Sequence, residues 1–419
     1  MTSADTAAPT APGFDAQRAI RDLRELANRT GGPAGSRRLC WTPEWAEARA
    51  MLREELSTLP VEVEQDEAGN LWAYLKGRSA ETVVVGSHLD SVPAGGWLDG
   101  ALGVMGGLEV LRSLAAAPEP PQRTFALVDW ADEEGARFSR SLFGSAAVVG
   151  TLDVDIVREL KDRWGNLLPE VVAEHGVSLD AIEGCRTRMT DVVAYLELHI
   201  EQGPILEHEG LGIGVVTGTY GIERERLIFS GQAAHAGTMP MGMRRDSLRA
   251  MSRFALELAE IGARHGGVTT VGSVSCWPGV VTAVPGTTTC TMDMRHISAE
   301  LLATMFEEMK AAAHAAAEAE GCTVELEHIF RIPPMIFDPK LVDSVRRAVK
   351  AVEGHEFELP SGALHDASEM ARVVPTAMVF TSSIAGLSHT KEEDTPDEHL
   401  AMGITAFHQA VMEAVNAPS

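Results

Sequence analysis

The chain alternates short apolar runs with stretches of helical periodicity. Buried apolar runs occur at four places: 83–85, 125–128, 194–198 and 377–380. The remaining pattern predicts helices at 15–29, 43–58 and 103–114, and two further short strands at 60–66 and 70–76. Apolar strands that alternate with helices are typical of a mainly parallel sheet with helices on both faces. The pattern therefore predicts an α/β domain.

A different rhythm fills residues 214–332. Its predicted elements are a strand, helix, strand, strand, helix and strand at 224–229, 244–265, 268–276, 287–295, 298–321 and 323–330. Ser298 is the expected N-cap of the second helix. This order is that of a ferredoxin-like βαββαβ unit, so we expect an inserted lid domain. The α/β domain would then comprise 14–213 and 333–419, after a disordered tail at 1–13.

Composition and charge exclude several classes of function. The 419 residues include 35 Lys and Arg against 60 Asp and Glu, and the net charge of −25 disfavours nucleic acid and membrane surfaces as partners. No run of about 18 apolar residues is present, and the N-terminus lacks the regions of a signal peptide, so we expect a cytoplasmic protein. The five scattered cysteines form no CxxC pair, which argues against a disulfide framework or a thiolate zinc site.

Potential metal ligands follow each of the four apolar runs. They are His88 and Asp90, Glu133 and Glu134, His199, and His389. Asp99 precedes the Gly-rich helix and is a further candidate, although a lone Asp there could instead cap the helix. Ligands of open α/β sheets bind outside the carboxyl ends of the strands. Imidazole and carboxylate groups without thiolates suit zinc, manganese, cobalt or nickel.

Several motifs around these residues resemble one family. They are Gly86-Ser-His-Leu-Asp-Ser-Val92, Gly95-Gly-Trp-Leu-Asp-Gly-Ala-Leu-Gly103, Glu133-Glu-Gly-Ala-Arg-Phe138, His199-Ile-Glu-Gln-Gly-Pro204 and Gly231-Gln-Ala-Ala-His-Ala-Gly-Thr238. The chain resembles the M20 metallopeptidase clan from about residue 15 to its end. Within that clan it is most similar to the amidase, hydantoinase and carbamoylase branch. This branch includes N-carbamoyl-L-amino acid hydrolases, β-ureidopropionases and allantoate amidohydrolases.

The resemblance implies a site for two divalent metal ions, with zinc expected and manganese, cobalt or nickel as alternatives. It assigns the ligands as His88 and His199 for one ion, Glu134 and His389 for the other, and Asp99 as the bridge. Glu133 would be the general base and acid, unless its role and that of Glu134 are exchanged. Asp90 would orient the ring of His88 through the second ring nitrogen.

The resemblance also implies residues that contact the substrate. His235 would polarise the scissile carbonyl, from the same chain or across a dimer interface, and Arg295 would clamp a substrate carboxylate. Gln202 and His365 are further expected contacts. Thr282 stands where the family usually has Asn, and its shorter side chain offers a different set of hydrogen bonds.

The expected function is that of a metal-dependent amidohydrolase. It would cleave an N-carbamoyl amino acid or a related ureido acid and release ammonia, carbon dioxide and an amino acid. The resemblance also implies a homodimer formed through the inserted domain, and half-exposed strands with an edge free to pair give independent support. The departure at Thr282 keeps an N-acyl amino acid amidase or a dipeptidase as the alternative. A catalytically silent binding protein is the remaining hypothesis, and the complete ligand set argues against it.

Overall fold

The computed structural model describes residues 13–418, which form two compact units. One unit runs up to Thr217 and resumes at Phe337, and the other comprises Gly218–Ile336. The expected boundaries, after 213 and after 332, lie a few residues before the observed ones. The expected tail at 1–13 lies outside the described residues, except for Gly13.

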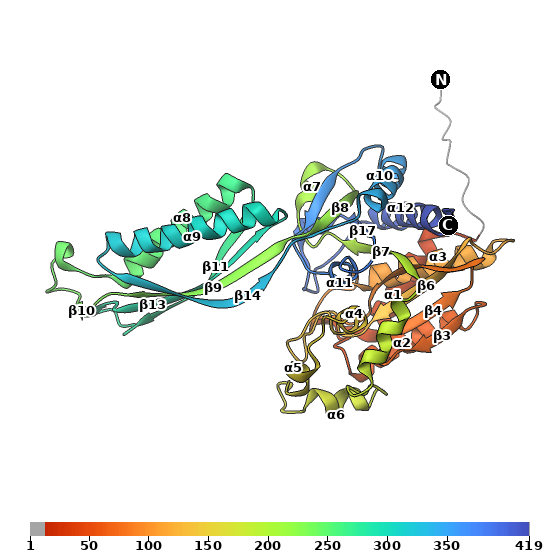
Figure 1. Ribbon diagram of the computed structural model, residues 1–419, viewed down its shortest axis with the longest axis horizontal. Helices are drawn as coiled ribbons and strands as arrows, with labels where there is room; N and C mark the ends of the chain where they lie inside the picture. The colour runs from red at the N-terminus through yellow and green to blue at the C-terminus, as the bar shows by residue number, and fades with distance from the viewer. Residues whose placement is uncertain (1–12, 419) are drawn as a thin grey trace, which may run out of the picture. The chain divides into compact units, whose positions relative to one another are not determined.

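The first unit is built on a nine-stranded mixed sheet (Figure 1). The strands follow the order β15 (Met335–Ile336), β8 (Ile213–Thr219), β17 (Thr376–Thr381), β7 (Val192–Ile200), β5 (Ser79–His88), β6 (Arg123–Trp130), β4 (Leu71–Leu75) and β3 (Glu62–Gln65), and β16 (Glu358–Ser361) pairs with β8. The four central strands, β17, β7, β5 and β6, pair in parallel. The outer pairs, β3–β4, β4–β6, β8–β17 and β8–β15, are antiparallel. The sheet is therefore parallel only in its centre.

The central strands are longer than the apolar runs that predicted them. Strand β5 extends to His88, and β7 extends past His199 to Ile200, because the backbone pairing with β6 and β17 continues through these polar residues. His88 and His199 are thus inside strands rather than in the loops that follow. Since parallel strands end at the same edge of a sheet, their polar last residues come together there.

Helices cover both faces of this sheet. Helices α3 (Ala101–Ala116) and α12 (Asp397–Asn416) pack on the face of β7 that carries Leu198. Helix α11 (Asp366–Met370) contacts Glu197, whose side chain lies on the opposite face because strand residues alternate. The remaining helices are α1 (Ala16–Thr30), α2 (Pro43–Leu56), α4 (Phe143–Val149), α5 (Val154–Arg158), α6 (Leu168–Ala173), α7 (Ile205–Glu209) and α10 (Pro339–Glu353). Neither α10 nor α12 was predicted from the sequence.

The second unit contains a four-stranded antiparallel sheet and two long helices. The sheet has the order β11 (Val268–Trp277), β13 (Thr287–His296), β9 (Gly221–Ser230) and β14 (Thr323–Ile332), and the helices are α8 (Ser247–His265) and α9 (Ala299–Ala319). A short pair, β10 (Ala234–His235) with β12 (Ala283–Val284), lies outside this sheet. Buried side chains of β9 and β13 pack with those of α8 and α9 in one core, which includes Phe229, Phe254 and Met305.

The helices of the second unit begin at side-chain caps. Ser298 accepts a hydrogen bond from the Leu301 N–H at 3.3 Å, which confirms the predicted N-cap of α9. Helix α8 begins at Ser247, three residues later than predicted, because Asp246 accepts hydrogen bonds from the backbone N–H groups of Leu248 and Arg249. A carboxylate at this position satisfies N–H groups that have no partner within the helix.

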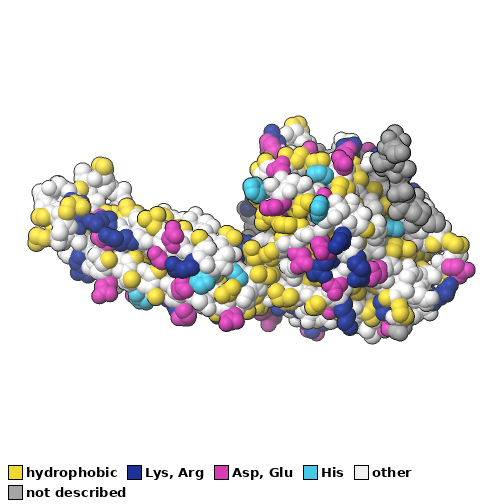
Figure 2. All heavy atoms as spheres, turned by 90° about the horizontal axis from the view of Figure 1, so that it is seen from above, with side chains coloured by type: hydrophobic (Ala, Val, Ile, Leu, Met, Phe, Trp, Pro, Cys, Tyr) yellow, Lys and Arg dark blue, Asp and Glu magenta, His cyan; other side chains and the backbone are white. Residues whose placement is uncertain are grey.

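The surface carries charges of both signs, and the cysteines form no disulfide bonds within the described residues. Acidic and basic side chains intermix on the face drawn in Figure 2. Within residues 13–418, none of the helices has the length and apolar character needed to cross a bilayer. All five cysteines are free thiols.

Close contact between α3 and β7 gives a test of the fold. A Cβ atom at Gly103 would lie 2.4 Å from the Leu198 carbonyl oxygen, whereas one at Gly106 would meet only the end of the Leu198 side chain, at 2.9 Å. We expect Gly103→Ala to lower the free energy of unfolding by about 1–3 kcal/mol relative to Gly106→Ala, since overpacking against backbone cannot relax. Both changes gain the same helix propensity, so urea unfolding of the two variants isolates the contact. Equal stabilities would contradict this packing.

Candidate metal and active site

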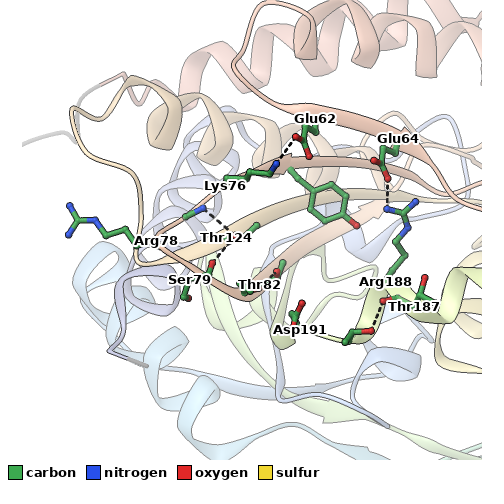
Figure 3. A pocket seen from close by; sticks show the side chains of 14 residues that line it. Glu62, Glu64, Lys76, Arg78, Ser79, Thr82, Thr124, Thr187, Arg188 and Asp191 are labelled. Carbon is green, nitrogen blue, oxygen red and sulfur yellow. Dashed lines mark hydrogen bonds and ion pairs between the residues drawn. The ribbon is translucent and has the colours of Figure 1, made fainter.

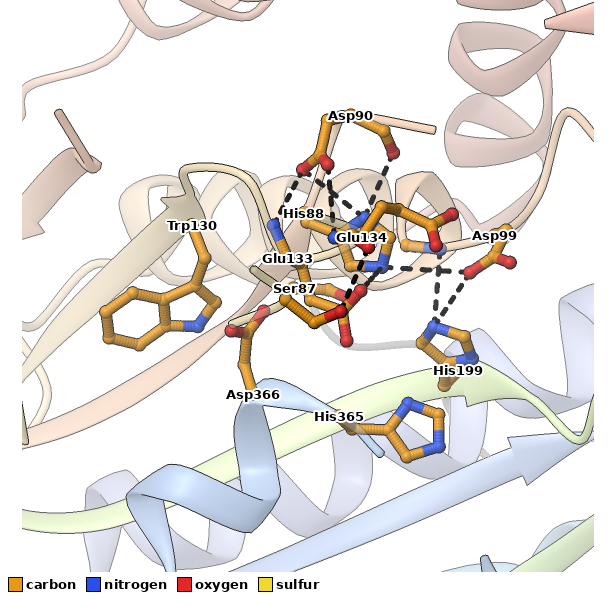
Figure 4. A network of polar contacts seen from close by, with 12 residues as sticks. Ser87, His88, Asp90, Asp99, Trp130, Glu133, Glu134, His199, His365 and Asp366 are labelled. Atoms are coloured by element: carbon orange, nitrogen blue, oxygen red, sulfur yellow. Dashed lines mark hydrogen bonds and ion pairs between the residues drawn. The ribbon is translucent and has the colours of Figure 1, made fainter. Parts of the chain in front are cut away.

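The candidate site lies at the carboxyl ends of the central strands. His88 ends β5, His199 lies near the end of β7, and Glu133 and Glu134 follow β6 (Figure 4). Asp99 reaches the same place from the loop before α3, and His389 from the loop before α12. Helix α3 has Gly100 as its N-cap and no side-chain cap, so the alternative of Asp99 as a helix cap is wrong.

The Asp99 carboxylate is the centre of the cluster. Its Oδ1 lies 3.3 Å from His199 Nε2 and 3.7 Å from His88 Nε2. Its Oδ2 lies 3.2 Å from His389 Nε2, which is in turn 3.4 Å from Glu134 Oε2. Two groups of ligand atoms, one with both strand histidines and one with His389 and Glu134, thus share Asp99. The structure brings together all five residues that the resemblance assigned as ligands.

The orientation of the imidazole rings fits a bound cation. His88 Nδ1 lies 3.0 Å from the Asp90 carbonyl oxygen, and His199 Nδ1 lies 2.9 Å from that of Ile200. Both Nδ1 atoms therefore donate a proton to a backbone carbonyl, which leaves Nε2 of each ring facing Asp99 as the atom that could bind a cation. The N–H of Gly100 points at His199 Nε2 from 3.3 Å, which agrees with an acceptor there. Converging imidazole and carboxylate donors suit a divalent metal ion.

Asp90 orients the ring of His88 through its second nitrogen, as expected. Its backbone carbonyl, not its carboxylate, orients the second nitrogen of His88, because the carboxylate Oδ1 is 3.6 Å away. The Asp90 carboxylate instead accepts hydrogen bonds from the backbone N–H groups of Glu133 and Glu134, each at 3.2 Å. Asp90 thus fixes the segment that carries both glutamates.

Glu133 lies beside the cluster without belonging to either ligand group. Its Oε2 is 3.6 Å from His88 Nε2, and the side chain is buried. Burial, together with the carboxylates of Asp366 and Glu134, raises the pKa of Glu133 well above its usual range. A carboxyl group with a raised pKa beside the ligands is suited to take up and deliver a proton.

The charges of the cluster are strongly coupled. Burial alone would raise the pKa of Asp99, but the imidazoles of His199 and His389 hold it well below its usual range. Burial of His199 would lower its pKa, but the hydrogen bond and charge of Asp99 raise it to about 9. The hydrogen bond with Asp99 also raises the pKa of His389 to about 9. Burial and the charge of Asp99 raise the pKa of Glu134 to about 8. A divalent cation would replace imidazole protons as the partner of these carboxylates.

Glu393 holds the two loops of the cluster together and was not predicted from the sequence. Its Oε1 accepts the backbone N–H groups of Leu98 and Asp99, both at 3.0 Å, and its Oε2 accepts the Ser388 hydroxyl at 2.8 Å. Ser388 precedes His389 in the chain, so one buried carboxylate connects the loops of two ligands. The available signal was its position four residues after His389.

Glu197, on β7 two residues before His199, bonds to residues around the cluster and was not predicted from the sequence either. It accepts hydrogen bonds from the Ser87 hydroxyl at 2.8 Å, the Tyr195 hydroxyl at 3.1 Å and the Ala367 N–H at 2.9 Å. Strand alternation puts Glu197 on the same face as His199, a pattern that could have identified it. His365 is buried beside this group, with its ring centre 4.4 Å from that of His199 and its Nε2 2.8 Å from the Ser361 hydroxyl.

Gln202, an expected substrate contact, bonds to the central carboxylate. Its Nε2 donates to Asp99 Oδ2 at 2.9 Å and lies 3.1 Å from the Ser388 hydroxyl. Gln202 and His389 both adopt left-handed backbone conformations, with φ of 59° and 58°. Non-glycine residues in this region are strained and cluster at functional sites.

The remaining predicted residues lie in the second unit. His235 is exposed, and its Nδ1 accepts the N–H groups of Gly237 at 3.0 Å and Thr238 at 3.3 Å, so its Nε2 carries a proton. The carbonyl of Thr282 accepts the Ala236 N–H at 2.9 Å, which brings Thr282 next to His235. Strand β13 begins at Thr287, a few residues after β12, which pairs with His235. Arg295 is near the opposite end of β13, about 27 Å from Thr287 at 3.4 Å per residue. There Arg295 Nε donates to Asp293 Oδ1 at 2.7 Å, and the structure does not bring it near His235.

A surface pocket of about 610 Å³ lies at the opposite, amino ends of the parallel strands, near Ser79, Thr124 and Asp191 (Figure 3). Its three basic side chains are already paired: Lys76 with Glu62 at 2.7 Å, Arg78 with Glu119 at 2.9 Å, and Arg188 with Glu64. The pocket therefore offers no obvious binding charge.

Comparisons with known proteins agree with this site. The model of peptidase family M20/M25/M40 matches residues 84–413. An N-carbamoyl-L-amino-acid amidohydrolase of Paenarthrobacter aurescens is 34% identical over 410 residues, which cover 96% of this chain and 98% of the relative. An allantoate amidohydrolase of Escherichia coli (strain K12) is 35% identical over 377 residues, covering 89% and 91%. A crystal structure of an amidase of the hydantoinase/carbamoylase family from Burkholderia multivorans matches with a TM-score of 0.91 and 34% identity, over 98% of this chain and 100% of that one.

The role of Glu393 can be tested against its neighbour. We expect Glu393→Ala to weaken zinc binding by about 10- to 100-fold, because three hydrogen bonds that position Asp99 and His389 are lost. Glu392→Ala is the matched control, since Glu392 is an exposed carboxylate on the same loop. Competition with a chromogenic chelator measures both affinities. Equal zinc affinities for the two variants would contradict the positioning role.

Proposed function

Because the chain belongs to peptidase family M20/M25/M40, we propose that it is a metal-dependent amidohydrolase. It cleaves the C–N bond of an N-carbamoyl amino acid or a related ureido acid. The names of two relatives, an N-carbamoyl-L-amino-acid amidohydrolase and an allantoate amidohydrolase, support hydrolysis of amide or ureido C–N bonds. The observation that carries the proposal is the Asp99 carboxylate shared by two groups of ligand atoms.

The cluster would hold two divalent ions, with zinc expected and manganese, cobalt or nickel as alternatives. His88 and His199 would hold one, His389 and Glu134 the other, and Asp99 both. When bound, two such ions polarise a substrate carbonyl and lower the pKa of a water molecule. The half-exposed His389 leaves one side of the cluster open for a substrate.

Glu133 moves the proton in this mechanism. Its carboxylate takes a proton from the attacking water, whose oxygen bonds to the carbonyl carbon of the substrate. Glu133 then delivers that proton to the nitrogen that leaves when the C–N bond breaks. Hydrolysis of a carbamoyl group in this way gives an amino acid, carbon dioxide and ammonia. The place of Glu133 beside the cluster, 3.6 Å from His88 Nε2 and outside both ligand groups, supports this use as both base and acid.

Residues of the inserted unit complete the proposed chemistry. His235 Nε2 donates a hydrogen bond to the oxygen on which negative charge develops, because Nδ1 already accepts two backbone N–H groups. Arg295 binds the substrate carboxylate in place of Asp293, and Gln202, Thr282 and His365 are the other proposed contacts. The unit acts as a lid that excludes water when it closes.

A homodimer formed through the inserted unit is part of the proposal. Among the described strands, β11 pairs only with β13 and is the edge of its sheet. Val274 and Trp277 of this strand are 48% and 67% exposed. An exposed apolar edge strand can pair with the same strand of a second copy. His235 would then act in its own chain or across that interface.

The substrate can be identified by the products released. We expect metal-loaded protein to release ammonia from N-carbamoyl-L-amino acids or allantoate, and a chelator to abolish this release. N-acetyl amino acids and dipeptides, assayed for free amine, test the alternative amidase or dipeptidase, which Thr282 in place of the usual Asn keeps open. Free amine without ammonia would replace the carbamoyl proposal with the acyl-amide one. No turnover of any of these substrates would favour a binding protein.

The proton carrier can be tested separately from the metal site. We expect Glu133→Gln to reduce kcat by about 10²- to 10⁴-fold, because the amide cannot accept the proton of water. Its metal content, measured by elemental analysis, should equal that of wild type, since Glu133 lies outside both ligand groups. Glu392→Gln controls for the change in net charge. Near-normal turnover by Glu133→Gln with full metal content would refute the assignment.

A further inference from the structure

A completely buried arginine lies behind the metal site without a full set of partners. Arg38 has no exposed surface, and its Nε donates to the Leu89 carbonyl at 2.7 Å. Its Nη1 and Nη2 atoms have no hydrogen-bond partner within residues 13–418. Leaving the donors of a buried cation unpaired is costly, by several kcal/mol for a fully desolvated charge. The charges of nearby carboxylates, foremost that of Glu393, act on Arg38, but none of these groups accepts a hydrogen bond from Nη1 or Nη2. Arg38 therefore has two donor groups left for an anionic ligand.

Arg38 lines a cavity of about 130 Å³ in the first unit. The walls are the short hairpin of β1 (Gly31–Gly32) and β2 (Gly35–Ser36) and the glycine-rich segment 95–97. Lys391, whose side chain is 55% exposed, also lines the cavity. Its Nζ is 3.8 Å from Glu392 Oε1, which is longer than a hydrogen bond. No carboxylate belongs to the lining, although the chain has 60 acidic and 35 basic residues. The charged side chains of the lining are therefore both basic, and the Glu393 carboxylate lies behind the wall at Gly96.

We propose that this cavity binds a small inorganic oxyanion such as sulfate or phosphate. The free edge of a guanidinium group forms paired hydrogen bonds with two oxygens of such an anion, and the Lys391 ammonium supplies a second charge. Glycines in the walls let the backbone approach the ligand closely. The volume corresponds to about four water molecules at ~30 Å³ each, which accommodates one five-atom oxyanion and excludes a nucleotide.

The anion would act on the metal site through the walls that the two sites share. Arg38 holds the Leu89 carbonyl, between His88 and Asp90, and its own carbonyl accepts the Ser91 N–H at 3.0 Å. The segment 95–97 leads directly to Asp99, and Lys391 follows His389 by two residues. A bound anion would therefore stiffen three ligand-bearing segments at once. This proposal does not depend on which substrate the enzyme hydrolyses.

A binding experiment tests the site in the metal-loaded protein. Sulfate at about 1–10 mM, with chloride added to constant ionic strength, should raise the Tm of wild type. Lys391→Met should reduce this shift at least twofold, and Arg38→Met should abolish it. Lys340→Met, which removes an exposed charge on α10, is the matched control and should keep the full shift. Equal shifts in Lys391→Met and Lys340→Met would overturn the proposal, even if the Arg38 variant fails to fold.

A crystal of wild type soaked in selenate locates the ion directly. The proposal requires an anomalous selenium peak within hydrogen-bond distance of Arg38 Nη1 and Nη2. Ordered water molecules alone at these atoms, or selenate found only at the metal site, would contradict it. Phosphate and acetate soaks then show whether tetrahedral or planar oxyanions are preferred.

Discussion

The structure depends on how one buried carboxylate is held between three imidazoles. Asp99 must present Oδ1 to the two strand histidines and Oδ2 to His389, and a small rotation would break one of the two ligand groups. The fold prevents that rotation from both sides. Glu393 fixes the Asp99 backbone, and the Gln202 amide donates to Asp99 Oδ2. Gly100 follows with φ of 64°, where a Cβ atom would lie 2.4 Å from the His88 ring. The conformation of residues 98–100 is thus fixed by Glu393 and by the close approach of the His88 ring.

The concentration of acid around Asp99 makes this arrangement costly without a cation. Glu133, Glu134 and Asp90 are mostly withdrawn from solvent, and burial raises the pKa of each. Like charges in a poorly solvated region repel strongly, so the carboxylates need either protons or positive charge. Two imidazoles with raised pKa supply part of that charge in the protein itself. The excess of acidic residues that gives the chain a net charge of −25 is thus also found within this site, which is suited to cations.

Local patterns in the sequence predicted the central strands, the first three long helices and the residues at the strand ends. The grouping of His88, His199, His389, Glu134 and Asp99 came from the family resemblance, and the structure brings them together. Residues that act over long sequence separations were missed. Glu393 contacts Leu98 and Asp99 across almost 300 positions, and no local pattern marks such a bond. Arg38 was missed for the same reason, whereas the expected contact of Asp90 with the second nitrogen of the His88 ring is present, through the Asp90 carbonyl.

Metal stoichiometry tests the proposed mechanism most directly, because Asp99 is proposed to serve as a ligand of two ions. Chelator-treated protein would be dialysed against zinc and its content measured by elemental analysis. Wild type should retain about two zinc ions per chain. Asp99→Ala, with its fold checked by circular dichroism, should lose both or bind them far more weakly. A single ion in wild type, or two ions retained with unchanged affinity in Asp99→Ala, would contradict the shared carboxylate.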